Sequence, residues 1–145
     1  MTYLLDVNVL IALIDPAHVA HDDAHHWFEA VGHKAWATCP ITENGAIRII
    51  GNAKYPNSPG SPAAVADIMR ALRALPGHHF WADSISLVET PSLDVAKVLT
   101  AAQVTDTYLL ALAKSRNGRL ATFDRKLSTV SVTEGKSTLC LIPNA

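Results

Sequence analysis

The chain has little cysteine and almost no net charge. Its 145 residues include only Cys39 and Cys140, which are too few for a disulfide framework and lack the spacing of a zinc site. The 12 basic and 13 acidic residues give a formal net charge of −1, so no basic surplus attracts the molecule to nucleic acid or to an anionic membrane. Any contact with RNA or DNA would therefore need a local basic patch or bound metal ions.

Long apolar runs are also missing. No apolar stretch approaches the roughly 20 residues of a membrane-spanning helix, and no basic region precedes the first short apolar run as in a secretory signal. Apolar residues still make up 49% of the chain, which excludes a disordered or collagen-like protein. Because no repeat or linker divides the sequence, residues 1–145 are expected to form a single cytoplasmic domain.

Strand-like and helix-like apolar patterns alternate along the chain, and this alternation predicts an α/β fold with a parallel sheet. A cluster of turn-forming residues at 52–60 predicts a surface loop, and Thr105 is a predicted N-cap. Strands are expected at 2–5, 34–39, 79–82, 119–123 and 138–142, and helices at 9–14, 20–31, 40–50, 62–75, from 104 to the terminator at 117–118, and at 92–102, where the pattern is weaker.

Four acidic residues hold comparable positions in these predicted elements. Asp6 and Asp124 directly follow strands, and Glu43 and Asp106 lie in the first turns of helices. In a parallel sheet the carboxyl ends of the strands share one edge, so all four could meet in one cleft. Taken singly, each acid also has a structural explanation, because the helix dipole favours acids in a first turn and Asp often begins a turn after a strand.

A cluster of four carboxylates would need a cation. Two carboxylates about 4 Å apart repel by about 4 kcal/mol at an effective dielectric constant near 20. Oxygen ligands without Cys or His suit Mg²⁺ or Mn²⁺ better than Zn²⁺. A site of this kind typically hydrolyses phosphate esters, because the metal activates a water molecule and neutralises the charge that develops on the phosphate.

The order of these short motifs resembles that of the PIN-domain ribonucleases, and most closely that of the VapC toxins of bacterial toxin–antitoxin pairs. The resemblance extends from Thr2 to about Ile142, with all four acidic positions filled in order. It rests on Asp6-Val7-Asn8 after the first strand, Thr42-Glu43 at a helix start, Thr105-Asp106 at another helix start, and the segment Leu120-Ala121-Thr122-Phe123-Asp124.

The resemblance implies a PIN-like three-layer α/β fold with a five-stranded parallel sheet flanked by helices. It also implies a metal-dependent endoribonuclease that cuts RNA, forms a homodimer and is held inactive by a cognate antitoxin protein. By this resemblance Asp6, Glu43, Asp106 and Asp124 would hold Mg²⁺ or Mn²⁺, with Asp124 able to act through a water molecule. Asn8 and Thr122 would orient the carboxylates or the attacking water.

Basic side chains suggest further contacts. Arg48 and Arg125 are candidates for binding RNA phosphates near the cleft, although each could equally form a surface ion pair. The segment His18–His26 contains the pair His21 and His25, spaced i, i+4 on a helix as a transition-metal site requires. Because a third ligand is lacking, a solvated helix face is the better interpretation of this pair.

Two other functions remain open at this point. An aspartyl-phosphate phosphatase or a phospho-receiver domain also places Asp at strand ends around Mg²⁺, but the residue two positions after Asp6 is Asn8, and no lysine follows a late strand in a convincing place. A non-catalytic acidic pocket could instead bind a basic peptide. That interpretation is partly compatible with a toxin, because an antitoxin could insert an Arg or Lys among the carboxylates.

Overall fold

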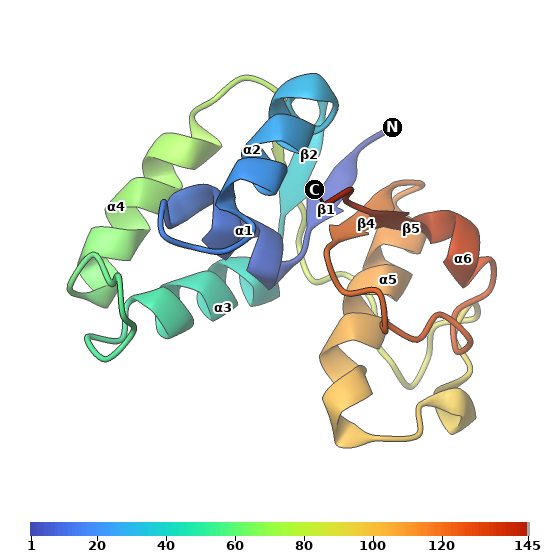
Figure 1. The fold of residues 1–145 in the computed structure, drawn as a ribbon. Coiled ribbons are helices and arrows are strands. Elements are labelled where there is room, and N and C mark those ends of the chain that lie inside the picture. The colour runs from blue at the N-terminus through green and yellow to red at the C-terminus, as the bar shows by residue number, and fades with distance from the viewer. Residues whose placement is uncertain (145) are drawn as a thin grey trace.

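Five parallel strands form the centre of the computed structural model, which describes residues 1–144 (Figure 1). Their order across the sheet is β3-β2-β1-β4-β5, and every neighbouring pair is parallel. The strands are β1 (Tyr3–Leu5), β2 (Trp36–Thr38), β3 (His78–Phe80), β4 (Arg119–Thr122) and β5 (Leu139–Leu141). The predicted five-stranded parallel sheet is therefore confirmed, with strands somewhat shorter than the apolar runs that predicted them.

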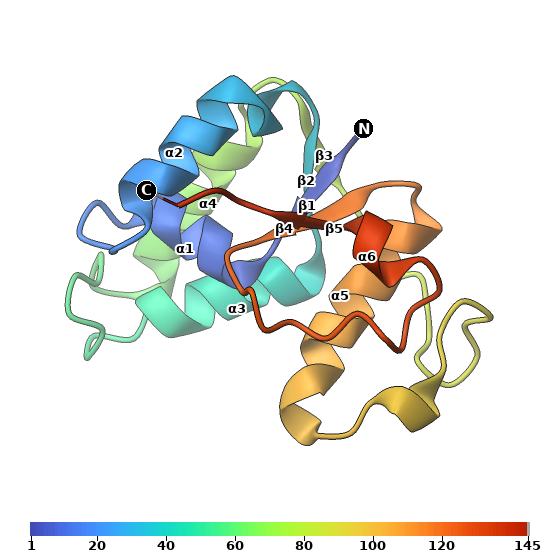
Figure 2. The same cartoon turned by 45° about the vertical axis from the view of Figure 1, so that its right-hand side comes forward.

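Helices cover both faces of this sheet. The helices are α1 (Val7–Ile14), α2 (His21–Ala30), α3 (Pro40–Ile50), α4 (Pro62–Arg73), α5 (Val104–Ser115) and the short α6 (Gly135–Thr138). Figures 1 and 2 show α1 to α4 on one side of the sheet and α5 and α6 on the other, which is the predicted three-layer arrangement. Within residues 1–144, no helix has both the length and the apolar character needed to cross a membrane.

The core has two parts because neighbouring residues of a strand face opposite sides of a sheet. Leu5 and Ala121 pack with residues of α1 to α4, whereas Leu4 and Leu120 pack with α5. All residues of α5 from Thr107 to Ala113 are buried, so this helix is covered on more than one side. The sheet is thus buried on both faces, as parallel sheets generally are.

The direction of the chain reverses at the pair β1 and β4. After β1 the chain builds β2 and β3 on one side, and it then returns to place β4 and β5 on the other side of β1. The Asp6 amide donates to the Ala121 carbonyl at 3.0 Å, so the ends of β1 and β4 lie side by side. In open α/β sheets such a reversal leaves a crevice at the carboxyl ends of the strands, where ligands bind.

Residues 92–102 do not form the predicted helix. They contain the 3₁₀ turn Val95–Lys97, and a second 3₁₀ turn, Ala101–Gln103, leads into α5. The Asp94 carboxylate accepts from the Ala96 amide and so caps a single turn, while Leu99 is 79% exposed and gives a longer helix no apolar face to bury. The predicted N-cap at Thr105 is also wrong, because α5 begins at Val104 after Gln103.

Candidate active site

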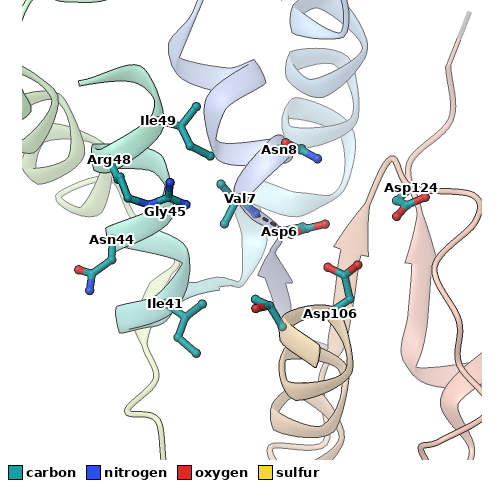
Figure 3. A pocket seen from close by; sticks show the side chains of 11 residues that line it. Asp6, Val7, Asn8, Ile41, Asn44, Gly45, Arg48, Ile49, Asp106 and Asp124 are labelled. Atoms are coloured by element: carbon teal, nitrogen blue, oxygen red, sulfur yellow. Dashed lines mark hydrogen bonds between the residues drawn. The ribbon is translucent and has the colours of Figure 1, made fainter. Parts of the chain in front are cut away.

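A cavity of about 420 Å³ opens at the carboxyl edge of the sheet, beside the ends of β1 and β4. Figure 3 shows the carboxyl groups of Asp6, Asp106 and Asp124 turned toward a common space. The structure thus brings together three of the four acids that the sequence singled out. The cavity is lined by Asp6, Val7, Asn8, Ile41, Asn44, Gly45, Arg48, Ile49, Thr105, Asp106 and Asp124.

Asp6 is fixed between the end of β1 and the start of α1. It is the N-cap of α1, and its Oδ1 accepts from the Val7 amide at 2.7 Å. Its Oδ2 accepts from the Thr122 hydroxyl, also at 2.7 Å, and the residue is only 6% exposed. Burial raises the pKa of Asp6 and the nearby Asp124 adds to this, so the pKa stays above its ordinary value despite the hydrogen bonds from Thr122 and Val7.

Asp106 and Asp124 share the charge environment of Asp6. Burial in the first turn of α5, together with the negative charges of Asp6 and Asp124, raises the pKa of Asp106 to about 6. The Asp124 amide donates to Thr122 Oγ1 at 3.1 Å, so one hydroxyl bridges the loop after β4 and the Asp6 carboxylate. The three acids therefore form one electrostatically coupled group, in which Thr122 fixes two members relative to each other.

This donor set fits a hard divalent cation with water molecules in its coordination shell. A cation would offset the burial and the repulsion from Asp6 and Asp124 that together raise the pKa of Asp106. Among residues 1–144 no three His, Cys, Asp or Glu side chains converge closely enough to hold a metal ion by themselves. Mg²⁺ is commonly bound through one or two carboxylates and keeps several waters, so these oxygen ligands suit Mg²⁺ or Mn²⁺ and not a structural zinc.

The structure does not bring Glu43 into this cavity. Glu43 Oε2 accepts from the Thr38 hydroxyl at 2.6 Å, and Oε1 accepts from Arg73 Nη1 at 3.2 Å. The expectation that all four acids meet in one cleft is therefore wrong for Glu43. The reason lies in the helical period: Glu43, Ile47 and Ile50 lie on the side of α3 that packs inward, toward α4.

The two predicted RNA-binding arginines have different surroundings. Arg48 lines the cavity from α3, and its side chain forms no hydrogen bond or ion pair with any residue of the described chain, 1–144. Arg125 is instead occupied by the C-terminal segment, because its guanidinium donates to the Ile142 carbonyl at 3.0 Å and contacts Asn144. Arg125 does not line the cavity, and its role as a phosphate contact stays a prediction.

The histidine pair of α2 has a structural contact that the sequence did not suggest. His21 Nδ1 donates to the Ala12 carbonyl at 2.7 Å, and His25 Nε2 donates to the Leu13 carbonyl at 2.8 Å. Both carbonyls belong to the last turn of α1, where no further helical amide is available to them. The expectation of a merely solvated face is wrong: the pair joins α2 to the end of α1.

Several residues that line the cavity were missed by the sequence interpretation. These are Ile41, Asn44, Gly45 and Ile49, which with the predicted Arg48 recur at i, i+3, i+4, i+7 and i+8, so one face of α3 forms a wall of the cavity. A Cβ atom on Gly45 would lie 2.8 Å from Val7 Cγ2, so this glycine allows α3 to approach the start of α1 closely. The helical spacing of these α3 residues was the sequence signal that could have identified them. The predicted Asn8 also lines the cavity, where its side chain is exposed.

Comparison with known proteins identifies the family. The PIN domain family model matches residues 3–132. Ribonuclease VapC44 of Mycobacterium tuberculosis is 40% identical over 132 residues, which cover 91% of this chain and 92% of that protein. The chain belongs to the VapC ribonucleases of the PIN-domain family. Two further VapC relatives from the same organism are similar: VapC39 is 44% identical over 128 residues (88% of this chain, 92% of the relative), and VapC38 is 41% identical over 139 residues (96% of each).

A solved VapC-containing structure has the same fold. The crystal structure of VapBC2 from Rickettsia felis, bound to a DNA fragment from its promoter, superposes with a TM-score of 0.57. The match covers 87% of this chain and 90% of that chain, at 15% identity. At so low an identity the comparison supports the fold alone.

Proposed function

We propose that this VapC-family chain is an endoribonuclease, the toxin of a toxin–antitoxin pair, and that it hydrolyses RNA phosphodiester bonds in a metal-dependent reaction. The observation that carries the proposal is the cavity at the β1 and β4 ends, where Asp6, Asp106 and Asp124 face one another. Relatives named ribonucleases, about 40% identical over most of the chain, support the same reaction. In this proposal residues 1–145 act as one domain.

Asp6, Asp106 and Asp124 would hold Mg²⁺ or Mn²⁺. When bound, the ion supplies an activated water molecule and neutralises charge on the phosphate. Thr122 keeps Asp6 oriented through its hydroxyl, and Asn8 at the cavity edge is placed to orient a water molecule. Arg48 offers a positive charge to the RNA backbone. Glu43 would contribute indirectly, because its bonds to Thr38 and Arg73 fix the start of α3 to β2 and α4.

The partners follow from the same cavity. The three carboxylates outnumber the single arginine that lines the cavity, so the cavity is complementary to a further Arg or Lys side chain, and a cognate antitoxin could block it by inserting a basic residue. We propose such an antitoxin as the partner, a homodimer as the working form, and the cytoplasm as the place where RNA is cut. The alternative of a receiver or phosphatase site has no support here, because no lysine lines the cavity among residues 1–144.

RNA cleavage by the purified chain tests this proposal. We expect internal cuts in single-stranded RNA with Mg²⁺ or Mn²⁺, no cleavage with EDTA, and recovery when the metal is restored. Asp67→Asn is the matched control for Asp6→Asn, because Asp67 is an exposed acid of α4 that pairs with Arg70 and does not line the cavity. Cleavage that persists in EDTA would contradict the proposal, and so would a failure to cleave RNA with both Mg²⁺ and Mn²⁺.

A further inference from the structure

The wall of the cavity that α3 forms differs in chemistry from the carboxylate side. Asp6, Asp106 and Asp124 supply three acids, whereas the α3 wall, made of Ile41, Asn44, Gly45, Arg48 and Ile49, supplies one cation, one amide and apolar surface. In Figure 3 the α3 side chains lie across the cavity from Asp106 and Asp124, with Asn44 at the outer edge. Asn44 and Arg48 are exposed, and neither side chain forms a hydrogen bond or ion pair with another residue of 1–144.

The distribution of charge around the carboxylates indicates on which side of them an RNA strand would lie. A second cavity, of about 680 Å³, adjoins the first at Asn8; its lining includes Asp22 and His18 and no Lys or Arg from the described part of the chain. It offers a phosphate no arginine or lysine, whereas Arg48 on α3 is a cation without an acidic partner. On α4 the cations are already compensated, because Arg70 pairs with Asp67 and Arg73 pairs with Glu43.

The two polar side chains of the α3 wall suit different parts of a nucleotide. A phosphate only accepts hydrogen bonds, which matches the donor-only guanidinium of Arg48. A base edge carries donors and acceptors together, and the Asn44 amide offers both. Ile41 and Ile49 add apolar surface beside them, against which the face of a base can pack. Such edges are exposed in single-stranded RNA and not in a duplex.

We propose that the α3 wall binds the nucleotide next to the scissile phosphate, with Arg48 on its phosphate and Asn44 on its base edge. Asn44 is then a specificity-determining residue, and Arg48 is a binding residue that does not discriminate between sequences. This inference rests on the proposed endoribonuclease function. It adds to that function the side on which the RNA strand lies and the residue that reads its sequence.

Arg48→Ala and Arg70→Ala form a charge-matched pair that tests the phosphate contact. Both remove one exposed arginine, but only Arg48 lines the cavity. Cleavage of single-stranded RNA is measured over a range of salt concentrations with the full-length chain. We expect Arg48→Ala to raise KM about tenfold and to reduce the slope of log KM against log salt by about 0.7, with Arg70→Ala near the parent protein. Equal effects of the two variants would contradict the contact.

Asn44→Ala and Asn44→Gln test the reading of a base. A pool of single-stranded RNA with randomised sequence is cut, and the bases that flank the cut sites are determined. We expect the parent chain to prefer one base at a fixed position next to the cut, and Asn44→Ala to reduce that preference about tenfold. Asn44→Gln, which keeps the amide but moves it outward, should change the preferred base or weaken the preference.

The outcomes separate this inference from the function on which it rests. If the parent chain cuts no RNA with Mg²⁺ or Mn²⁺, the endoribonuclease proposal fails, and the subsite fails with it. If the parent chain cuts RNA and both Asn44 variants keep its flanking-base preference, the specificity role of Asn44 is wrong while the nuclease function stands. Circular dichroism of each variant verifies that this exposed substitution leaves the fold intact.

Discussion

Two buried aspartates mark the two ends of α1, and they differ in almost every other respect. Asp6 caps the start of the helix and is 6% exposed; Asp15 follows its end and is 5% exposed. Burial raises the pKa of Asp6 and its acidic neighbour Asp124 adds to that rise. Burial acts on Asp15 in the same direction, but hydrogen bonds from Asn57, Tyr55 and the Ala17 amide outweigh it and hold the pKa of Asp15 below its ordinary value.

The difference separates a structural carboxylate from one that is available for chemistry. Asp15 accepts from the Tyr55 hydroxyl, from Asn57 Nδ2 at 2.7 Å and from the Ala17 amide at 2.9 Å, so its charge is satisfied inside the protein. The contacts of Asp15 with Tyr55 and Asn57 tie the loop after α3 to the end of α1. Asp6 instead faces Asp106 and Asp124, and no basic side chain among residues 1–144 forms an ion pair with its carboxylate.

The largest expected effect is on activity, at Asp6. Asp6→Asn keeps an oxygen that can accept from the Val7 amide but removes the charge that would hold a metal. We expect cleavage of RNA to fall by about 100-fold or more, as is common when a transition-state contact is lost. Because the raised pKa shows that the ionised form is disfavoured by folding, stability in urea should be unchanged or slightly higher. Retained activity would contradict the assignment.

The largest expected effect on stability is at Asp15. Asp15→Ala leaves Tyr55 and Asn57 without their buried acceptor, and we expect urea unfolding to show a loss of about 2–4 kcal/mol. A lowered pKa stabilises the fold above the ordinary value of 3.8, and this contribution is lost as the pH falls through the folded pKa. The variant should therefore lose part of the parent's acid sensitivity. The variant should still cleave RNA at a temperature at which it is folded.

Metal binding should depend on the protonation of Asp106. With a pKa of about 6, this carboxyl is mostly ionised at pH 7 and mostly protonated at pH 5, so we expect the affinity for Mn²⁺ to fall about tenfold between these values. Calorimetric titration with Mn²⁺ at the two pH values measures this affinity and the protons that are released when the metal binds. In the metal-free protein, the contribution of Asp106 to stability depends on pH in the opposite sense to that of Asp15. It is fully present below the ordinary pKa of 3.8 and is lost as the pH rises through about 6.

The smallest expected effect is at Glu43, which extends the comparison to a third acid. Glu43 is 14% exposed by side chain, and its ion pair with Arg73 is partly solvated. Glu43→Gln keeps an acceptor for the Thr38 hydroxyl, so unfolding in urea should change by less than about 1 kcal/mol. RNA cleavage should fall less than in Asp6→Asn. An equally severe loss, together with weaker Mn²⁺ binding, would return Glu43 to the ligand set that the sequence suggested.

Much of the candidate site could be predicted because it depends on the ends of strands and helices. Asp6 and Asp124 follow apolar runs, and a parallel sheet brings the ends of such runs to one edge whatever the details of packing. Glu43 shows where this reasoning stops. Its position in the first turn does not determine which side of α3 Glu43 occupies. That side is indicated only by Ile47 and Ile50, which lie on the inward face of the helix, four and seven residues after Glu43.

Other features depended on residues far apart in the chain. Asp15 follows the helix predicted at 9–14 and was given no role there; its role comes from Tyr55 and Asn57, 40 and 42 positions later. His21 and His25 were expected in solvent, but the packing of α2 places them on the last carbonyls of α1. Arg125 was expected at the cleft, but its guanidinium donates to the carbonyl of Ile142, the residue after β5.

The order of apolar and acidic residues by itself determined the α/β class, the parallel sheet and the edge at which Asp6 and Asp124 emerge, because these follow from local periodicity and from the shared direction of parallel strands. Only the tertiary structure decided which acids meet without a counter-charge and which are neutralised by neighbours. That decision depends on side-chain direction and on desolvation, and both are set by contacts between distant segments of the chain.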